Sequence, residues 1–213
     1  MRYGLNSPAN YRLRAVRGEK PKAGANGAPA WRTGRISRSP MTIDDAGELI
    51  GGIHTTARET WADLGCGDGT FTLALATSLK RASVIHAMDL DASALRRIPN
   101  EYAGTTIVTH TGDFTQPPWP FGRLDGILLA NSLHYVRDQQ TFIRTCEQEM
   151  NHPRRFLIVE YDTDRANTWV PYPISLRRLE HLFGDAGYSS IRLGTRLSIY
   201  QRVPIYAALM ENS

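Results

Sequence analysis

Cysteine is scarce in this chain of 213 residues, which contains only Cys66 and Cys146. The two lie 80 residues apart and form no CxxC pair, so neither a disulfide framework nor a cysteine-based zinc site is indicated. We therefore expect no metal. No run reaches the ~18 to 20 apolar residues of a membrane span, and no apolar signal segment follows Arg2. These absences predict a cytoplasmic protein with no membrane partner.

Acidic residues are nearly missing from the N-terminal part of the chain. Residues 1–40 hold nine Lys and Arg side chains against one acid, whereas residues 41–213 hold 16 basic and 20 acidic side chains. The N-terminal part also lacks apolar periodicity, so we expect a disordered basic extension before one folded domain at 41–213. This extension is interpreted either as a nucleic-acid arm or as a solvated leader. The scattered charges of the extension and its content of only three aromatic residues favour the leader. The acidic balance of the domain makes nucleic acid an unlikely partner.

From Met41 onward, helical and strand-like patterns alternate along the chain, which is typical of a mostly parallel sheet with helices on both faces. Strands are predicted at 60–64, 83–88, 105–110, 124–130, 156–159, 189–193 and 199–209. Helices are predicted from about residue 42, and at 71–79, 91–100, 138–150 and 175–186. The last two strands have no helix between them, and so short a connection implies an antiparallel pair. The fold class is therefore a doubly wound α/β sheet.

An acidic residue ends each of the first three predicted strands: Asp63, Asp89 and Asp113. In an open α/β sheet, ligands bind outside the carboxyl ends of the central strands, so these acids are expected along one rim. A carboxylate such as Asp89 can accept both hydroxyls of a ribose. Asp113 is suited to accept from an adenine amino group, and Phe114 or Leu90 would pack against the ring. The pattern predicts an adenosine site.

Glycines at 65, 67 and 69 follow the first strand and let the backbone approach an anionic part of the ligand. A nicotinamide-binding loop has the spacing GxGxxG, and here Thr70 stands where its third glycine would be. The motifs Asp-Leu-Gly-Cys-Gly-Asp-Gly-Thr, Met-Asp-Leu-Asp and Gly-Asp-Phe instead resemble the class I S-adenosylmethionine-dependent methyltransferases. The resemblance covers about Met41 to the C-terminus. It implies a seven-stranded sheet whose last strand is antiparallel.

The same resemblance implies S-adenosylmethionine as the cofactor. The cofactor-binding residues that we expect are Asp63, Gly65, Cys66, Gly67, Asp89, Leu90, Asp113, Phe114 and Asn131. The segment from Leu128 to Tyr135 resembles the fourth strand of small-molecule methyltransferases. It departs from the Asn/Asp-Pro-Pro-aromatic segment of enzymes that methylate exocyclic amino groups, which argues against nucleobases as acceptors.

His134 follows the fourth strand and is a candidate general base for an oxygen or nitrogen acceptor; the alternative is a histidine that only packs beside the site. Tyr135, Glu160, Trp169 and Tyr172 are candidates for binding a small-molecule acceptor. Trp169 and Tyr172 equally suit a surface loop that covers the core. Two further functions stay open: a module that binds the cofactor without catalysis and acts through a partner, and an RNA methyltransferase.

Overall fold

The computed structural model describes residues 40–198 and 203–212. Residues 1–39, which make up nearly all of the expected basic extension, lie outside the described residues. The helices are α1 (Ile43–Leu49), α2 (Thr70–Ser78), α3 (Ala92–Leu95), α4 (Gln139–Gln148) and α5 (Leu176–Gly184), with a short 3₁₀ turn η2 (Leu133–Tyr135). The strands are β1 (Thr60–Leu64), β2 (Val84–Asp89), β3 (Glu101–Tyr102), β4 (Thr105–Thr111), β5 (Gly126–Ala130), β6 (Arg154–Tyr161), β7 (Ser189–Leu197) and β8 (Pro204–Asn212). None of the helices in this part of the chain is long and apolar enough to cross a bilayer.

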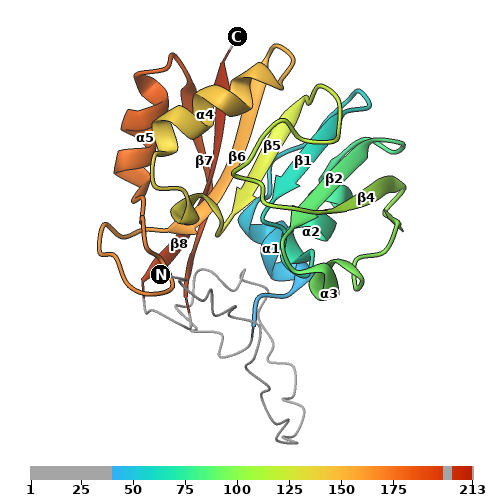
Figure 1. Ribbon diagram of the computed structural model, residues 1–213, viewed down its shortest axis with the longest axis horizontal. Coiled ribbons are helices and arrows are strands. Elements are labelled where there is room, and N and C mark those ends of the chain that lie inside the picture. The colour runs from blue at the N-terminus through green and yellow to red at the C-terminus, as the bar shows by residue number, and fades with distance from the viewer. Residues whose placement is uncertain (1–39, 199–202, 213) are drawn as a thin grey trace, which may run out of the picture. The chain divides into compact units, whose positions relative to one another are not determined.

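One mixed sheet runs through the domain in the order β3-β4-β2-β1-β5-β6-β8-β7. Five neighbouring strands of this order run parallel: β4, β2, β1, β5 and β6. Strand β8 runs antiparallel to both of its neighbours, β6 and β7. This arrangement confirms the doubly wound α/β fold and the antiparallel last strand (Figure 1). Strand order reverses between β1 and β5, so the ligand-binding edge of such a sheet lies where these strands end.

The expected number of seven strands was wrong, because a short strand, β3, adds an eighth at the sheet edge. Ala103 and Gly104 both have positive φ angles, of 52° and 83°. This conformation makes a two-residue hairpin turn, which returns the chain so that β3 pairs antiparallel with β4. The predicted helix at 91–100 is accordingly shorter, at Ala92–Leu95.

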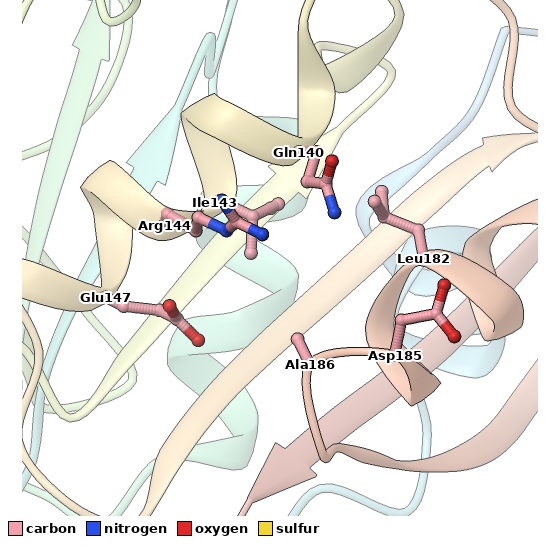
Figure 2. A pocket seen from close by; sticks show the side chains of 7 residues that line it. All are labelled: Gln140, Ile143, Arg144, Glu147, Leu182, Asp185 and Ala186. Carbon is pink, nitrogen blue, oxygen red and sulfur yellow. The ribbon is translucent and has the colours of Figure 1, made fainter.

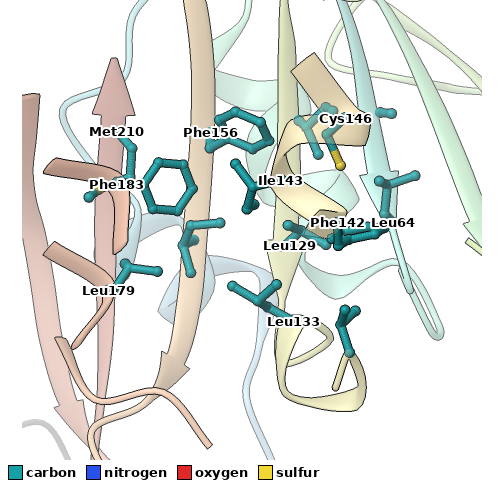
Figure 3. Packing of buried hydrophobic residues seen from close by; sticks show 14 of the residues in the cluster. Leu64, Leu129, Leu133, Phe142, Ile143, Cys146, Phe156, Leu179, Phe183 and Met210 are labelled. Carbon is teal, nitrogen blue, oxygen red and sulfur yellow. The ribbon is translucent and has the colours of Figure 1, made fainter. Parts of the chain in front are cut away.

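Helices cover the two faces of the sheet with separate apolar clusters. In Figure 1, α4 and α5 lie in front of the strands from β5 to β8, whereas α1 and α2 lie behind. Figure 3 shows the front cluster, to which α4 contributes Phe142 and Ile143. Phe183 of α5 packs edge-on against Phe156 of β6, with ring centroids 5.2 Å apart. Burying each such side chain contributes roughly 1.5–3 kcal/mol relative to leaving it exposed. This packing holds α4 and α5, and with them the loops at the carboxyl ends of β5 and β6.

Side-chain caps set where the covering helices begin. Thr42 and Asp45 form a reciprocal capping box at α1, and Asp138 accepts the backbone N–H of Thr141 at 3.0 Å at the start of α4. Ser175 is the N-cap of α5. Each cap satisfies a backbone N–H that the first helical turn leaves without a partner. The caps of α4 and α5 lie beside the segments that follow β5 and β6, and so fix these segments at the edge of the sheet.

Candidate cofactor and acceptor site

The loop between β1 and α2 is built on glycines with positive φ angles: 81° at Gly65, 56° at Gly67 and 86° at Gly69. A Cβ at Gly65 would lie 2.6 Å from Cβ of Ser132 and 3.1 Å from a ring carbon of Phe114. Gly65 therefore touches the segments that follow β5 and β4. A Cβ at Gly67 would meet no atom within 4 Å, so this glycine faces open space. The loop is tightly enclosed at its start and open at its middle.

Asp89, at the end of β2, is tied to this loop. Its Oδ2 accepts the N–H of Gly67 at 2.8 Å, and its Oδ1 accepts the N–H of Asp91 at 2.8 Å. The main chain makes the same connection, because the N–H groups of Gly65 and Cys66 donate to the carbonyl of Met88 at 2.8 and 3.1 Å. Each carboxylate oxygen has two lone pairs, so Asp89 is held in place and can still accept hydroxyl groups.

Asp63 lies beneath the loop and is completely buried. Its Oδ2 accepts the hydroxyl of Thr72 in α2 at 2.5 Å, whereas its Oδ1 has no hydrogen-bond partner. Burial raises the pKa of Asp63 to about 7, the hydroxyl of Thr72 opposes this shift, and the negative charge of Asp89 adds to it. A cationic donor placed against Oδ1 would favour the ionised carboxylate.

Cys66 lies between the first two glycines of the loop, and most of its thiol is shielded from solvent. Burial raises the pKa of this thiol far above its usual range, and the negative charges of Asp63 and Asp89 add to the effect. The thiol therefore stays protonated at neutral pH. Cys66 is suited to packing against a bound molecule and not to nucleophilic chemistry.

The expected adenine neighbours have contrasting environments. Asp113 is exposed, and its Oδ1 accepts both the N–H and the hydroxyl of Thr115, at 2.9 and 2.7 Å. Phe114 is buried and packs edge-on against Phe142, with ring centroids 5.9 Å apart. Leu90 is 69% exposed. An exposed leucine next to Asp89 is available to cover a ring, whereas Phe114 is shared between the site and the core.

Asn131 and Ser132 follow β5 and contribute polar atoms that have no partner in the protein. Asn131 has a φ of 54°, and its N–H donates to the carbonyl of Val159 at 2.7 Å. Its Oδ1 and the Oγ of Ser132 are buried without hydrogen bonds, as is Oδ1 of Asp63. Sequence reasoning missed Ser132; its place directly after a central strand was the available signal. Buried polar atoms without partners are uncommon, so this group near Gly65 fits a polar ligand.

His134 and Glu160 form a buried pair on the other side of this edge. Nδ1 of His134 lies 2.7 Å from Oε2 of Glu160, and the backbone N–H of His134 donates to Oε1 at 3.1 Å. Glu160 is 1% exposed, so its carboxylate faces His134 and not solvent. Sequence reasoning named both residues but gave no sign that they pair, because they lie on different strand ends.

Aromatic side chains surround this pair. The ring of Tyr135 lies 4.4 Å from that of His134 by centroids and is about half exposed. The backbone N–H of Tyr172 donates to the carbonyl of His134 at 3.0 Å, which ties the loop after β6 to η2. Trp169, in the same loop, is 53% exposed. The structure thus brings Tyr135 and Tyr172 close to His134, and the loop after β6 that carries Tyr172 also exposes the ring of Trp169.

The hollow in Figure 2 lies elsewhere, between α4 and α5. It has a volume of about 230 Å³ and is lined by Gln140, Ile143, Arg144, Glu147, Leu182, Asp185 and Ala186. None of the candidate site residues lines it. The case for the strand-end site therefore depends on the convergence of separate segments at Gly65 and on the unpartnered polar atoms there. Within residues 40–198 and 203–212, no three His, Cys, Asp or Glu side chains are grouped to hold a metal ion.

Comparison with known proteins agrees with this geometry. Residues 62–151 match the family model of a methyltransferase domain, which covers the loop, the acids and η2. The described domain shares its fold with solved methyltransferases, including one with bound S-adenosylmethionine, and this agrees with the family model matched by residues 62–151.

Individual relatives are distant. An uncharacterized methyltransferase of Mycobacterium tuberculosis is 32% identical over 79 residues, which are 37% of this chain and 39% of that protein. The match thus spans well under half of that relative. Magnesium protoporphyrin IX methyltransferase of Synechocystis PCC 6803, solved with bound S-adenosylmethionine, has a TM-score of 0.56 at 16% identity, covering 80% of this chain and 78% of that one. A methyltransferase of Methanosarcina mazei has a TM-score of 0.56 at 11% identity, with 75% and 94% covered. At such identities the solved structures establish a shared fold.

Proposed function

We propose that this protein transfers the methyl group of S-adenosylmethionine to a small-molecule acceptor. The observation that carries the proposal is the meeting of three strand ends at one glycine loop. Gly65 contacts the segments after β4 and β5, and the N–H of Gly67 is held by Asp89 of β2. The unpartnered oxygens of Asp63, Asn131 and Ser132 fit a ligand with polar groups at this point. A nucleoside carrying an amino acid has hydroxyl, amine and carboxylate groups to match.

Each residue has a role in holding such a molecule. Asp89 accepts the ribose hydroxyls, while Asp113 accepts from the adenine amino group and Leu90 and Phe114 contact the ring. The methionine end lies at the glycine loop, where Asp63 and Asn131 offer acceptor oxygens to an ammonium group. The free N–H groups at the start of α2 favour a carboxylate.

The bound sulfonium supplies an activated methyl group, so the protein has to position the acceptor, exclude water and receive a proton where the acceptor has one to lose. We assign His134 the role of receiving that proton. Tyr135, Trp169 and Tyr172 supply apolar surface for a small acceptor beside it. Support for RNA as the acceptor comes only from the basic N-terminal residues, which lie outside the described part of the chain, and we favour a metabolite.

Calorimetry with S-adenosylmethionine and its demethylated product tests the cofactor assignment. An Asp89→Ala variant should bind both at least tenfold more weakly, because charge-assisted hydrogen bonds contribute about 1.5–3 kcal/mol each and tenfold corresponds to about 1.4 kcal/mol. Asp185→Ala, at the far end of α5, is the matched control and should bind normally. Lack of binding by the unaltered protein would refute the proposal.

Turnover on a panel of metabolites, followed by mass spectrometry of the products, then separates an enzyme from a module that only binds the cofactor. Binding without turnover on any acceptor favours the non-catalytic alternative.

A further inference from the structure

The pair formed by His134 and Glu160 has a geometry that packing alone does not require. Two N–H donors of His134, one from the ring and one from the backbone, converge on the two oxygens of one carboxylate at 2.7 and 3.1 Å. Both side chains are almost completely buried, with 3% and 1% of their surfaces exposed. A buried carboxylate is costly unless it is paired and hydrogen-bonded, and here a single histidine provides both bonds.

The two converging donors dictate which nitrogen of His134 carries the proton. A carboxylate can accept at both oxygens, so the neutral ring has its proton on Nδ1 and its lone pair on Nε2. A carboxamide at the same place has one acceptor and one donor end. If the NH₂ end of the carboxamide faces the backbone N–H of His134, the hydrogen bond donated by that N–H is lost. If the NH₂ end faces Nδ1, it favours the ring with its proton on Nε2. Glu160 is thus suited to holding His134 as a proton acceptor.

The surroundings of this pair restrict the kind of acceptor. Tyr135 and Tyr172 are 49% and 39% exposed, and Trp169, in the loop with Tyr172, is 53% exposed, so large aromatic surfaces are open to solvent here. Asn167 accepts the N–H groups of Trp169 and Val170 at 2.8 and 3.0 Å, which fixes the loop. Exposed aromatic surface that is held in place favours a flat, apolar molecule.

Tyr135 also relates this pair to the cofactor side of the site. Burial raises the pKa of the Tyr135 hydroxyl, and the negative charges of Glu160 and Asp89 contribute to the increase. Its side chain therefore lies within the field of both carboxylates.

We infer that the acceptor is an aromatic hydroxyl compound, a phenol in the chemical sense, and that Glu160 is the positioning residue that keeps Nε2 of His134 ready to accept its proton. The inference rests on the proposed function. The hydroxyl proton passes to Nε2, and the oxygen forms a bond to the methyl carbon. The carbon–sulfur bond breaks with its electrons going to sulfur, which yields the neutral thioether. The resulting imidazolium of His134 is stabilised by Glu160 and returns its proton to solvent.

The first test reads the protonation of His134 without any turnover. In protein labelled with ¹⁵N at histidine, Nδ1 and Nε2 have different shifts according to which one carries hydrogen. We expect the proton on Nδ1 in the unaltered protein. In Glu160→Gln we expect either a shift of the proton toward Nε2 or a changed backbone amide signal of His134, according to which end of the carboxamide faces Nδ1. Glu101→Gln, on the exposed edge strand β3, should leave the spectrum of His134 unchanged.

A ring with its proton on Nε2 in the unaltered protein would overturn the inference. So would a folded Glu160→Gln variant in which neither the ring nitrogens nor the backbone amide of His134 change, because either orientation of the carboxamide loses one of the two bonds. The spectrum of the unaltered protein decides the first point even where that variant does not fold. Glu160→Asp keeps two acceptor oxygens and should keep the proton on Nδ1.

The second test measures methyl transfer from S-adenosylmethionine to phenol and catechol, with aniline and thiophenol as probes of other nucleophiles. We expect methylation on oxygen, and a fall in kcat of about 100-fold or more in His134→Ala, because a general base contributes roughly 10² to 10⁴. Glu160→Gln should lower kcat at least tenfold and change KM for the phenol less than twofold.

Products methylated only at nitrogen or sulfur, no transfer to either phenol, or an unchanged kcat in both variants would refute the assignment of the acceptor. Calorimetry and the metabolite panel together distinguish this failure from failure of the proposed function. If only the acceptor is wrong, S-adenosylmethionine still binds and another metabolite is methylated. If the proposed function is wrong, either S-adenosylmethionine does not bind or no metabolite is methylated.

Discussion

Gly65→Ala is the substitution that most directly tests whether the glycine loop is enclosed as the structure shows. An alanine at a φ of 81° costs roughly 1–2 kcal/mol in backbone strain. Its Cβ would also lie 2.6 Å from Cβ of Ser132, and relieving such an overlap in a packed region costs about 1–3 kcal/mol. The free energy of unfolding should therefore fall by about 2–5 kcal/mol, a large part of the ~5–15 kcal/mol typical of a domain.

Gly67→Ala is the matched comparison for this prediction. Gly67 has a φ of 56°, but no atom lies within 4 Å of its added Cβ. Only backbone strain applies, so the expected loss is about 1–2 kcal/mol. For a chain of this size each kcal/mol lowers Tm by roughly 2–4 °C, so thermal and urea unfolding separate the two variants.

The result that would refute the reasoning is a Gly65→Ala variant no less stable than Gly67→Ala. That outcome would mean that the loop does not press on the segments after β4 and β5. Calorimetry adds a second readout. Gly65→Ala should weaken binding of S-adenosylmethionine because Ser132 and Phe114 must move, and normal binding would contradict the proposed enclosure.

Four further changes have expected outcomes. The first is Asp63→Asn. The pKa of Asp63 in the folded protein is about 7, above the ordinary 3.8, so the folded protein holds an extra proton between these pH values. Asp63 therefore lowers the free energy of unfolding as pH rises from about 4 to 7, and urea titrations of the variant should lack this trend. The second is His86→Phe. Burial and the neighbouring His110 lower the pKa of His86 from 6.5 to about 4. His86 therefore lowers the free energy of unfolding as pH drops from 6.5 toward 4, and the variant should lose less stability over that range. Gly126→Ala: its Cβ would lie 2.5 Å from the indole of Trp61, and unfolding should show a loss of about 1–3 kcal/mol or more, whereas an unchanged midpoint would disprove the close contact. Gly184→Ala: this residue in α5 has free space around it, so the variant should gain roughly 0.5–1 kcal/mol, and a loss would count against the packing described here.

The two pH trends oppose each other in the unaltered protein. Asp63 favours the folded state at the acidic end of the range, and His86 favours it at the neutral end. A flat profile of stability against pH is therefore compatible with both shifts. The single variants separate the two contributions, because each leaves the other group in place.

Local chemistry in the sequence was enough to predict the elements that depend on neighbouring residues. The glycine loop after the first strand, the acid at the end of the second and the short link between the last two strands are local patterns, and they predicted the fold class. The eighth strand was missed because the hairpin at Ala103 requires a positive φ at a residue that usually avoids it.

Tertiary structure decided what these residues do together. The sequence alone marked Asp63 as a residue of the site, but only packing under α2 buries it and raises its pKa. His134 and Glu160 were separate candidates, and only the adjacency of β5 and β6 brings them within 2.7 Å. The pattern of residues along the chain determines where strands and turns occur, because these depend on local conformation and periodicity. Hydrogen-bond partners, burial and protonation depend on segments far apart in the chain, so they are settled only when the sheet brings those segments together.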